Sequence, residues 1–176
     1  MTLLTVWPDD QPGHVVLRTE DFGAIVAELR RVGAGFARWP LLDGSDEDWL
    51  ARYREVLDAR VGGDCSVEVA AGEPSLVERR WGGVEERFFV QGAAVWYLHA
   101  GREVHAVLCE PGDVLTVPAG VSHWHDGGLR AGYVTVRVRR GGGGCRGGVV
   151  RAVEPGEFPG FEELVAGRGG GAVLSG

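Results

Sequence analysis

The sequence predicts a mostly β, α+β fold, in which short antiparallel strands close into a small barrel or jelly roll beside N-terminal helices. Two observations predict the strands. The run from Phe88 to His99 is rich in aromatic and β-branched residues, and tight turns with Gly or Pro at 100–102, 110–113 and 118–120 separate further short apolar runs. A third observation predicts the helices, because two segments before these strands place apolar residues at helical spacing. Helices followed by a run of strands are typical of helices packed outside a barrel.

The N-terminal third is expected to hold both helices. Short strands are expected at 2–6, 15–17 and 36–39. The first helix is expected at 20–32, with Thr19 as its N-cap and Gly33 as its end. A second helix is expected at 46–60, after Ser45 as N-cap, with apolar residues on one face.

The rest of the chain is expected to be strand-rich. Strands are expected at 65–70, 88–99, 104–109, 114–117, 121–125 and 131–139, followed by a last strand at 149–153, a helical turn at 161–165 and a frayed tail. In the segment 131–139, alternation places Tyr133, Thr135, Arg137 and Arg139 on one face of the strand.

Length and composition fit one domain of ordinary globular character. The chain has 176 residues, of which 44% are hydrophobic and 24% charged. We expect a single domain at 1–140, with a Gly-rich, partly flexible extension at 141–176. The net charge of −7 disfavours nucleic acids and acidic membranes as partners, because both would repel the chain.

Composition also indicates the compartment. The three cysteines are widely spaced and form neither a disulfide framework nor a zinc motif. No secretion signal and no apolar run near the ~18 residues of a membrane span is evident, so a cytoplasmic protein is expected.

One stretch resembles a known superfamily. Gly112, followed after five residues by Pro118-Ala119-Gly120 and after two more by His123, resembles the second motif of the cupins. Glu85, followed after six residues by Gly92, resembles the end of the first motif. Within the cupins, the core 85–127 is similar to the acireductone dioxygenases, which use Fe(II) or Ni(II) in methionine salvage. The resemblance implies a double-stranded β-helix and a small-molecule substrate.

The same resemblance implies a metal site that this sequence lacks in part. The family binds its metal through three His and one Glu, and its His-x-His pair would fall at positions 79 and 81. Those positions hold Arg79 and Trp81, so only Glu85 and His123 remain of the expected ligands.

A first hypothesis keeps the positive charge and gives up the metal. Arg79 would lie beside Glu85 and, with Arg87 and His123, hold a small enol or carboxylate substrate. The resemblance implies the substrate role of Arg87. A histidine near its ordinary pKa could act there as general acid or base in an isomerisation, cyclisation or dehydration. The residues expected to bind substrate are Arg79, Trp81, Arg87 and Phe89, and those expected to be catalytic are Glu85, His123 and His125.

Two other hypotheses remain open. In one, a single Fe(II) or Ni(II) ion is retained by a changed set, Glu85, His123 and His125, which suits a non-haem dioxygenase. In the other, the protein binds a small molecule without catalysis, in an interior rich in Trp81, Trp96 and Trp124. Exposed strand edges would permit a homodimer.

Overall fold

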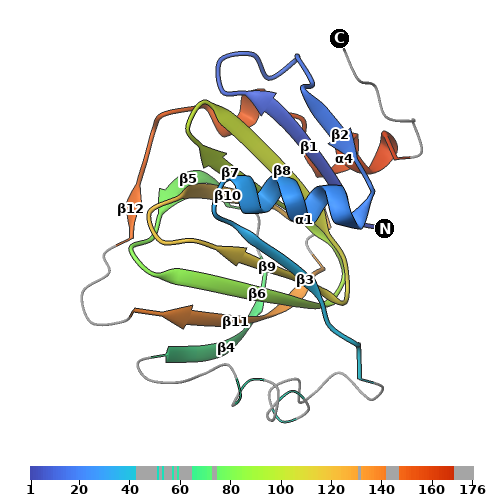
Figure 1. Ribbon diagram of the computed structural model, residues 1–176, viewed down its shortest axis with the longest axis vertical. Coiled ribbons are helices and arrows are strands. Elements are labelled where there is room, and N and C mark those ends of the chain that lie inside the picture. The colour runs from blue at the N-terminus through green and yellow to red at the C-terminus, as the bar shows by residue number, and fades with distance from the viewer. Residues whose placement is uncertain are drawn as a thin grey trace.

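Two antiparallel sheets face each other and form most of the molecule (Figure 1). The computed structural model describes residues 1–42, 51, 53, 57, 59, 65–72, 75–130, 132–141 and 147–168. The seven-stranded sheet has the order β12-β5-β10-β7-β8-β1-β2, and the five-stranded sheet has the order β3-β9-β6-β11-β4. The strands are β1 (Leu3–Pro8), β2 (Leu17–Thr19), β3 (Gly35–Arg38), β4 (Cys65–Ala71), β5 (Ser75–Arg80), β6 (Val84–Gln91), β7 (Ala94–Ala100), β8 (Glu103–Cys109), β9 (Asp113–Val117), β10 (Ser122–Asp126), β11 (Val134–Arg140) and β12 (Gly148–Val149).

Helix α1 (Phe22–Arg31) packs against residues of both sheets; Figure 1 shows it in front of the strands. Its buried residues, Ile25 and Leu29, join a cluster that includes Leu4 of one sheet and Phe36 of the other. Asp21, rather than the expected Thr19, is the N-cap, because its carboxylate accepts a hydrogen bond from the amide of Ala24 at 2.7 Å.

The expected second helix at 46–60 lies outside the described residues, except for four isolated positions. Two of these, Tyr53 and Leu57, are buried against the outer face of the five-stranded sheet. Tyr53 contacts Phe88 edge to face, with ring centroids 4.6 Å apart. Segments 142–146 of the expected Gly-rich extension and 169–176 of the expected tail also lie outside the described residues.

Alternation along each strand separates three hydrophobic clusters. On β6, Phe89 faces the other sheet and joins the interior cluster, whereas Phe88 faces outward. On the seven-stranded sheet, Trp96 faces the interior, whereas Trp124 faces outward and stacks on Tyr97. The expectation that Trp124 lines the interior is therefore wrong, because it lies next to His123 and His125 in the strand and takes the opposite face.

The C-terminal segment covers the outer face of the seven-stranded sheet (Figure 1). After β12, the chain forms the 3-10 turn η1 (Pro155–Glu157) and helix α4 (Phe161–Ala166). Phe158 and Leu164 bury their side chains in the cluster that contains Trp124. None of the described helices is both long enough and apolar enough to cross a membrane.

Candidate functional site

Glu85 lies at the centre of a polar group on the interior face of β6. Glu85 shares this face with Arg87 and Phe89, and only 2% of its surface is exposed to solvent. One carboxylate oxygen accepts a hydrogen bond from Arg87 Nε at 2.7 Å, and the other accepts one from Arg139 Nε at 2.8 Å. Burial alone would raise the pKa of Glu85, but the charges and hydrogen bonds of the two arginines lower it to about 2. Glu85 is therefore a paired carboxylate at neutral pH.

Arg87 is held on three sides. Its Nε binds Glu85, its Nη1 donates to Thr135 Oγ1 at 3.3 Å, and its guanidinium lies 4.5 Å from the ring centroid of Trp96. Burial lowers the pKa of Arg87, and the charge of Glu85 opposes that change. These contacts fix the guanidinium in one orientation.

Arg139 approaches Glu85 from the neighbouring strand. In the β6–β11 register Arg139 lies directly opposite Glu85, so the two side chains share the interior face. Its guanidinium also lies 5.0 Å from the ring centroid of Trp81, in the turn between β5 and β6. The Nε1 of Trp81 is buried and has no hydrogen-bond partner among the described residues.

His123 and His125 both point inward from β10 but have different surroundings. The Nδ1 of His123 donates to the carbonyl of Val121 at 3.1 Å, which leaves Nε2 as the unprotonated nitrogen of the neutral ring. Burial lowers the pKa of His123, and the backbone hydrogen bond and the charge of Glu85 partly oppose this. The ring of His125 stacks on Trp96 at a centroid distance of 4.5 Å.

Two of the residues expected to bind substrate differ in burial. Phe89 is fully buried and contacts Trp96 edge to face, so it forms part of the interior wall. Arg79 lies opposite His123 in the β5–β10 register, but it is exposed. The guanidiniums beside Glu85 are those of Arg87 and Arg139, so the expectation that Arg79 neutralises Glu85 is wrong.

Tyr133 and Arg139 were not selected as site residues from the sequence. Alternation in 131–139 correctly placed them on one face, but it did not show that this face points inward. Tyr133 is 2% exposed and lies edge to face with both Trp96 and His125. A Cβ atom added to Gly72 would lie 1.7 Å from Cζ of Tyr133, so a glycine is needed behind this ring.

The interior residues do not fit the iron or nickel ion that the family resemblance implies. Both oxygens of Glu85 are engaged by arginines. Among the described residues, the ligand atoms of Glu85, His123 and His125 do not all lie within 4.8 Å of one another. The described group that meets this distance is Glu28, Glu103 and His105, and Arg31 already pairs with both carboxylates there.

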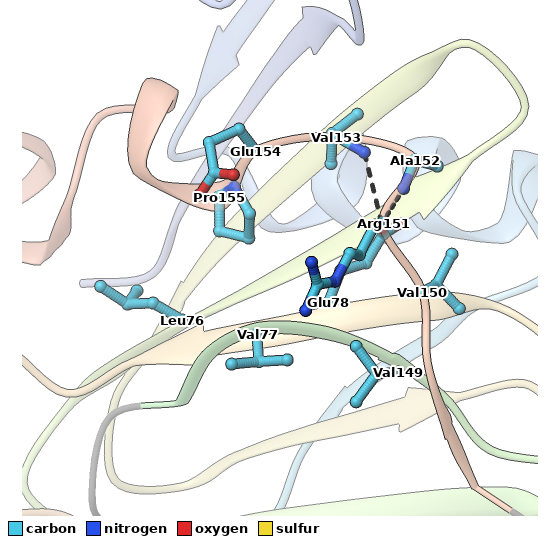
Figure 2. Close-up of a pocket in the computed structure, with 10 residues that line it drawn as sticks. All are labelled: Leu76, Val77, Glu78, Val149, Val150, Arg151, Ala152, Val153, Glu154 and Pro155. Atoms are coloured by element: carbon cyan, nitrogen blue, oxygen red, sulfur yellow. Dashed lines mark hydrogen bonds between the residues drawn. The ribbon is translucent and has the colours of Figure 1, made fainter.

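A pocket of about 450 Å³ lies elsewhere, between β5 and the C-terminal segment (Figure 2). Glu78 forms its base, where one carboxylate oxygen accepts from the amides of Ala152 and Val153 and the other lies 2.7 Å from His99 Nδ1. None of the residues expected to act in the site lines this pocket. The barrel interior therefore remains the candidate site.

The comparisons with known proteins agree on one family. A model of the ARD/ARD' family matches residues 80–140. The acireductone dioxygenase of Saccharopolyspora erythraea is 37% identical over 190 residues, which cover 96% of this chain and 100% of that relative. Acireductone dioxygenase 2 of Nocardia farcinica is 41% identical over 160 residues, which cover 78% of this chain and 84% of the relative.

A solved structure supports the fold. Acireductone dioxygenase from Bacillus anthracis with a cadmium ion in its active center matches with a TM-score of 0.56 at 20% sequence identity. The match covers 79% of this chain and 91% of that chain. The expected double-stranded β-helix is thereby confirmed.

Proposed function

The chain belongs to the acireductone dioxygenase family, and we propose that it is a divergent member performing acid–base chemistry on a small enol or carboxylate substrate. The single observation that carries the proposal is the engagement of Glu85 by two guanidiniums. A carboxylate bound on both oxygens is a poor metal ligand, because binding a metal would leave the buried cation of Arg87 without its partner. The polar groups retained in the interior suit proton transfer.

Each residue expected in the site has a role in this proposal. Arg87 holds the negative charge of the substrate, and Glu85 positions Arg87 through the hydrogen bond to Nε. His123 takes up or gives a proton at Nε2, since its Nδ1 is committed to Val121. Trp81 and Phe89 form apolar walls, His125 is a second proton carrier, and Arg79 adds positive charge near His123.

Solvent proton exchange tests this function directly. We expect chelator-treated protein in D₂O to exchange the acidic C–H of an acireductone or a small 2-oxo acid, as followed by NMR. His123 would take the proton from carbon and return a deuteron. We expect His123→Asn to slow the exchange by roughly 10²-fold or more, the usual size of a general-base effect.

A second candidate is a non-haem dioxygenase, which the names of the relatives favour. Glu85 would then have to leave both arginines and bind the ion together with His123 and His125. Stoichiometric Fe or Ni in protein purified without chelator, with metal-dependent O₂ uptake on acireductone, would support this candidate against ours. Tight binding of the 2-oxo acid, without exchange of its C–H proton and without O₂ uptake, would instead indicate a protein that binds a small molecule without catalysis.

A further inference from the structure

We infer that Arg139 takes the place of a metal cation at Glu85 and forms, with Trp81, a binding site for a small carboxylate or enolate anion. This inference takes one thing from the proposed function, which is that the substrate binds in the barrel interior. Arg139 donates from Nε to Glu85 at 2.8 Å and lies over the ring of Trp81. Position 81 is one of the two where the family resemblance places histidine ligands. The position that lacks an expected histidine and a guanidinium bound to Glu85 therefore meet at one point of the barrel.

The charges of this region leave a positive excess. Glu85 is the carboxylate that pairs with both Arg87 and Arg139, so two guanidiniums share one negative charge. The adjacent interior guanidinium, Arg137, pairs with Glu68 of β4. Glu68 also forms a longer ion pair with Arg139, whose Nη1 lies 3.9 Å from its carboxylate, so three guanidiniums share two carboxylates. An anion entering this space would therefore meet a net attraction.

The geometry leaves the binding ends of both arginines available. Each uses its Nε to reach Glu85, and each lies over an indole ring, which fixes the plane of the guanidinium. Among the described residues, Nη2 of Arg87 and both terminal nitrogens of Arg139 have no hydrogen-bond partner. Paired oxygens of a carboxylate or an enediolate match such a planar donor.

Unpartnered buried donors point to the same ligand chemistry. Trp81 Nε1, Trp96 Nε1 and Arg137 Nε are buried without a hydrogen-bond partner among the described residues. All three groups can only donate, and leaving a buried donor unpaired is unfavourable. An oxygen-rich anion supplies acceptors, whereas an apolar ligand or a cation supplies none.

Binding of oxalate, measured by isothermal titration calorimetry, tests the inference. We expect Arg139→Gln to weaken oxalate binding by about tenfold to a hundredfold, the usual worth of a charged hydrogen bond. Arg139→Lys keeps the charge but loses the planar guanidinium, so its oxalate affinity should fall between those of the wild type and Arg139→Gln. The matched control is Arg140→Gln, because Arg140 is the next residue of β11, faces outward and pairs with Glu86. Its oxalate affinity should equal that of the wild type.

A second measurement guards against a folding defect. Urea unfolding of Arg139→Gln and Arg139→Lys shows whether each variant is folded, and Arg139→Lys keeps a cation beside Glu85, so it should stay folded while binding oxalate less tightly than the wild type. Unchanged oxalate affinity in folded Arg139→Gln would overturn the inference. So would one Ni(II) bound per wild-type chain and lost in Glu85→Gln, as measured by titration with Ni(II) alone.

The two proposals fail separately. Oxalate binding that depends on Arg139, without any proton exchange, would keep this inference and reject the proposed function. Exchange that depends on His123, with oxalate affinity independent of Arg139, would do the reverse.

Discussion

At the scale of single residues, Glu85 determines the electrostatics of the interior. Its folded-state pKa of about 2 lies below the ordinary value of 4.5. The carboxylate therefore contributes stability that is fully present above pH 4.5 and is lost as the pH falls toward 2. The family resemblance makes Glu85 an expected metal ligand, whereas in this structure Glu85 forms ion pairs with two arginines.

We predict that Glu85→Gln lowers the free energy of unfolding by about 3–5 kcal/mol, the usual result of leaving a buried charge unpaired. Arg87, 7% exposed at its side chain, would be that charge. Urea unfolding measures the loss. Glu86→Gln on the opposite face is the control and should cost only about 1 kcal/mol, since its partner Arg140 is partly exposed. Equal losses in the two variants would contradict the prediction.

At the scale of elements, a charged cluster attaches α1 to β8. His105 is fully buried, and its Nε2 lies 3.0 Å from Glu28 of α1, 3.9 Å from Glu103 and 3.4 Å from Arg31. Burial lowers the pKa of His105, although its hydrogen bond to Glu28 opposes this. The unfolded chain therefore binds a proton at this site more readily than the folded chain does.

Because the pKa of His105 is lower in the folded chain than in the unfolded chain, the free energy of unfolding should depend on pH. As the pH falls below about 6.5, the ordinary pKa of histidine, the unfolded state gains protons first and the free energy of unfolding decreases. We predict a smaller decrease between pH 7.5 and pH 5.5 for His105→Gln than for the wild type, by urea unfolding at both pH values. The exposed His14 supplies the control, since His14→Gln should leave the decrease unchanged. An identical decrease in all three proteins would exclude His105 as its source.

The elements themselves were predictable where the sequence has a clear period. The expected helix at 20–32 contains α1, because its apolar residues recur at helical spacing. Strand β5 was missed, because Ser75–Arg80 shows no alternation and exposes Leu76 and Val77. The expected single strand at 88–99 is β6 and β7 with a turn at Gly92, whose φ of 65° favours glycine.

At the scale of the whole molecule, the site depends on which strands pair. The resemblance led to Glu85, Arg87 and His123, because these lie inside or beside the motifs. It did not lead to Arg139, because the position opposite Glu85 follows from the register of β11, some 50 residues along the chain. Tertiary packing sets which residues of distant strands lie opposite each other, so this register cannot be predicted from the alternation of apolar and polar residues within one strand.

The C-terminal segment stabilises the seven-stranded sheet from outside. Phe158 lies 6.0 Å from Trp7 and 5.7 Å from Trp124 between ring centroids. We predict that Phe158→Ala lowers the free energy of unfolding by about 3–5 kcal/mol, as is usual for a buried Phe. Val165→Ala on the exposed side of α4 should cost less than about 0.5 kcal/mol. A small loss in Phe158→Ala would show that the segment adds little to the fold.

The glycine behind Tyr133 has a consequence for how this barrel can diverge. Gly72 directly follows β4 and contacts no expected ligand, yet any larger side chain there would collide with the ring of Tyr133, which lies against His125 and Trp96. Substitution at one position outside the chemistry would thus displace the aromatic rings that pack beside the candidate site.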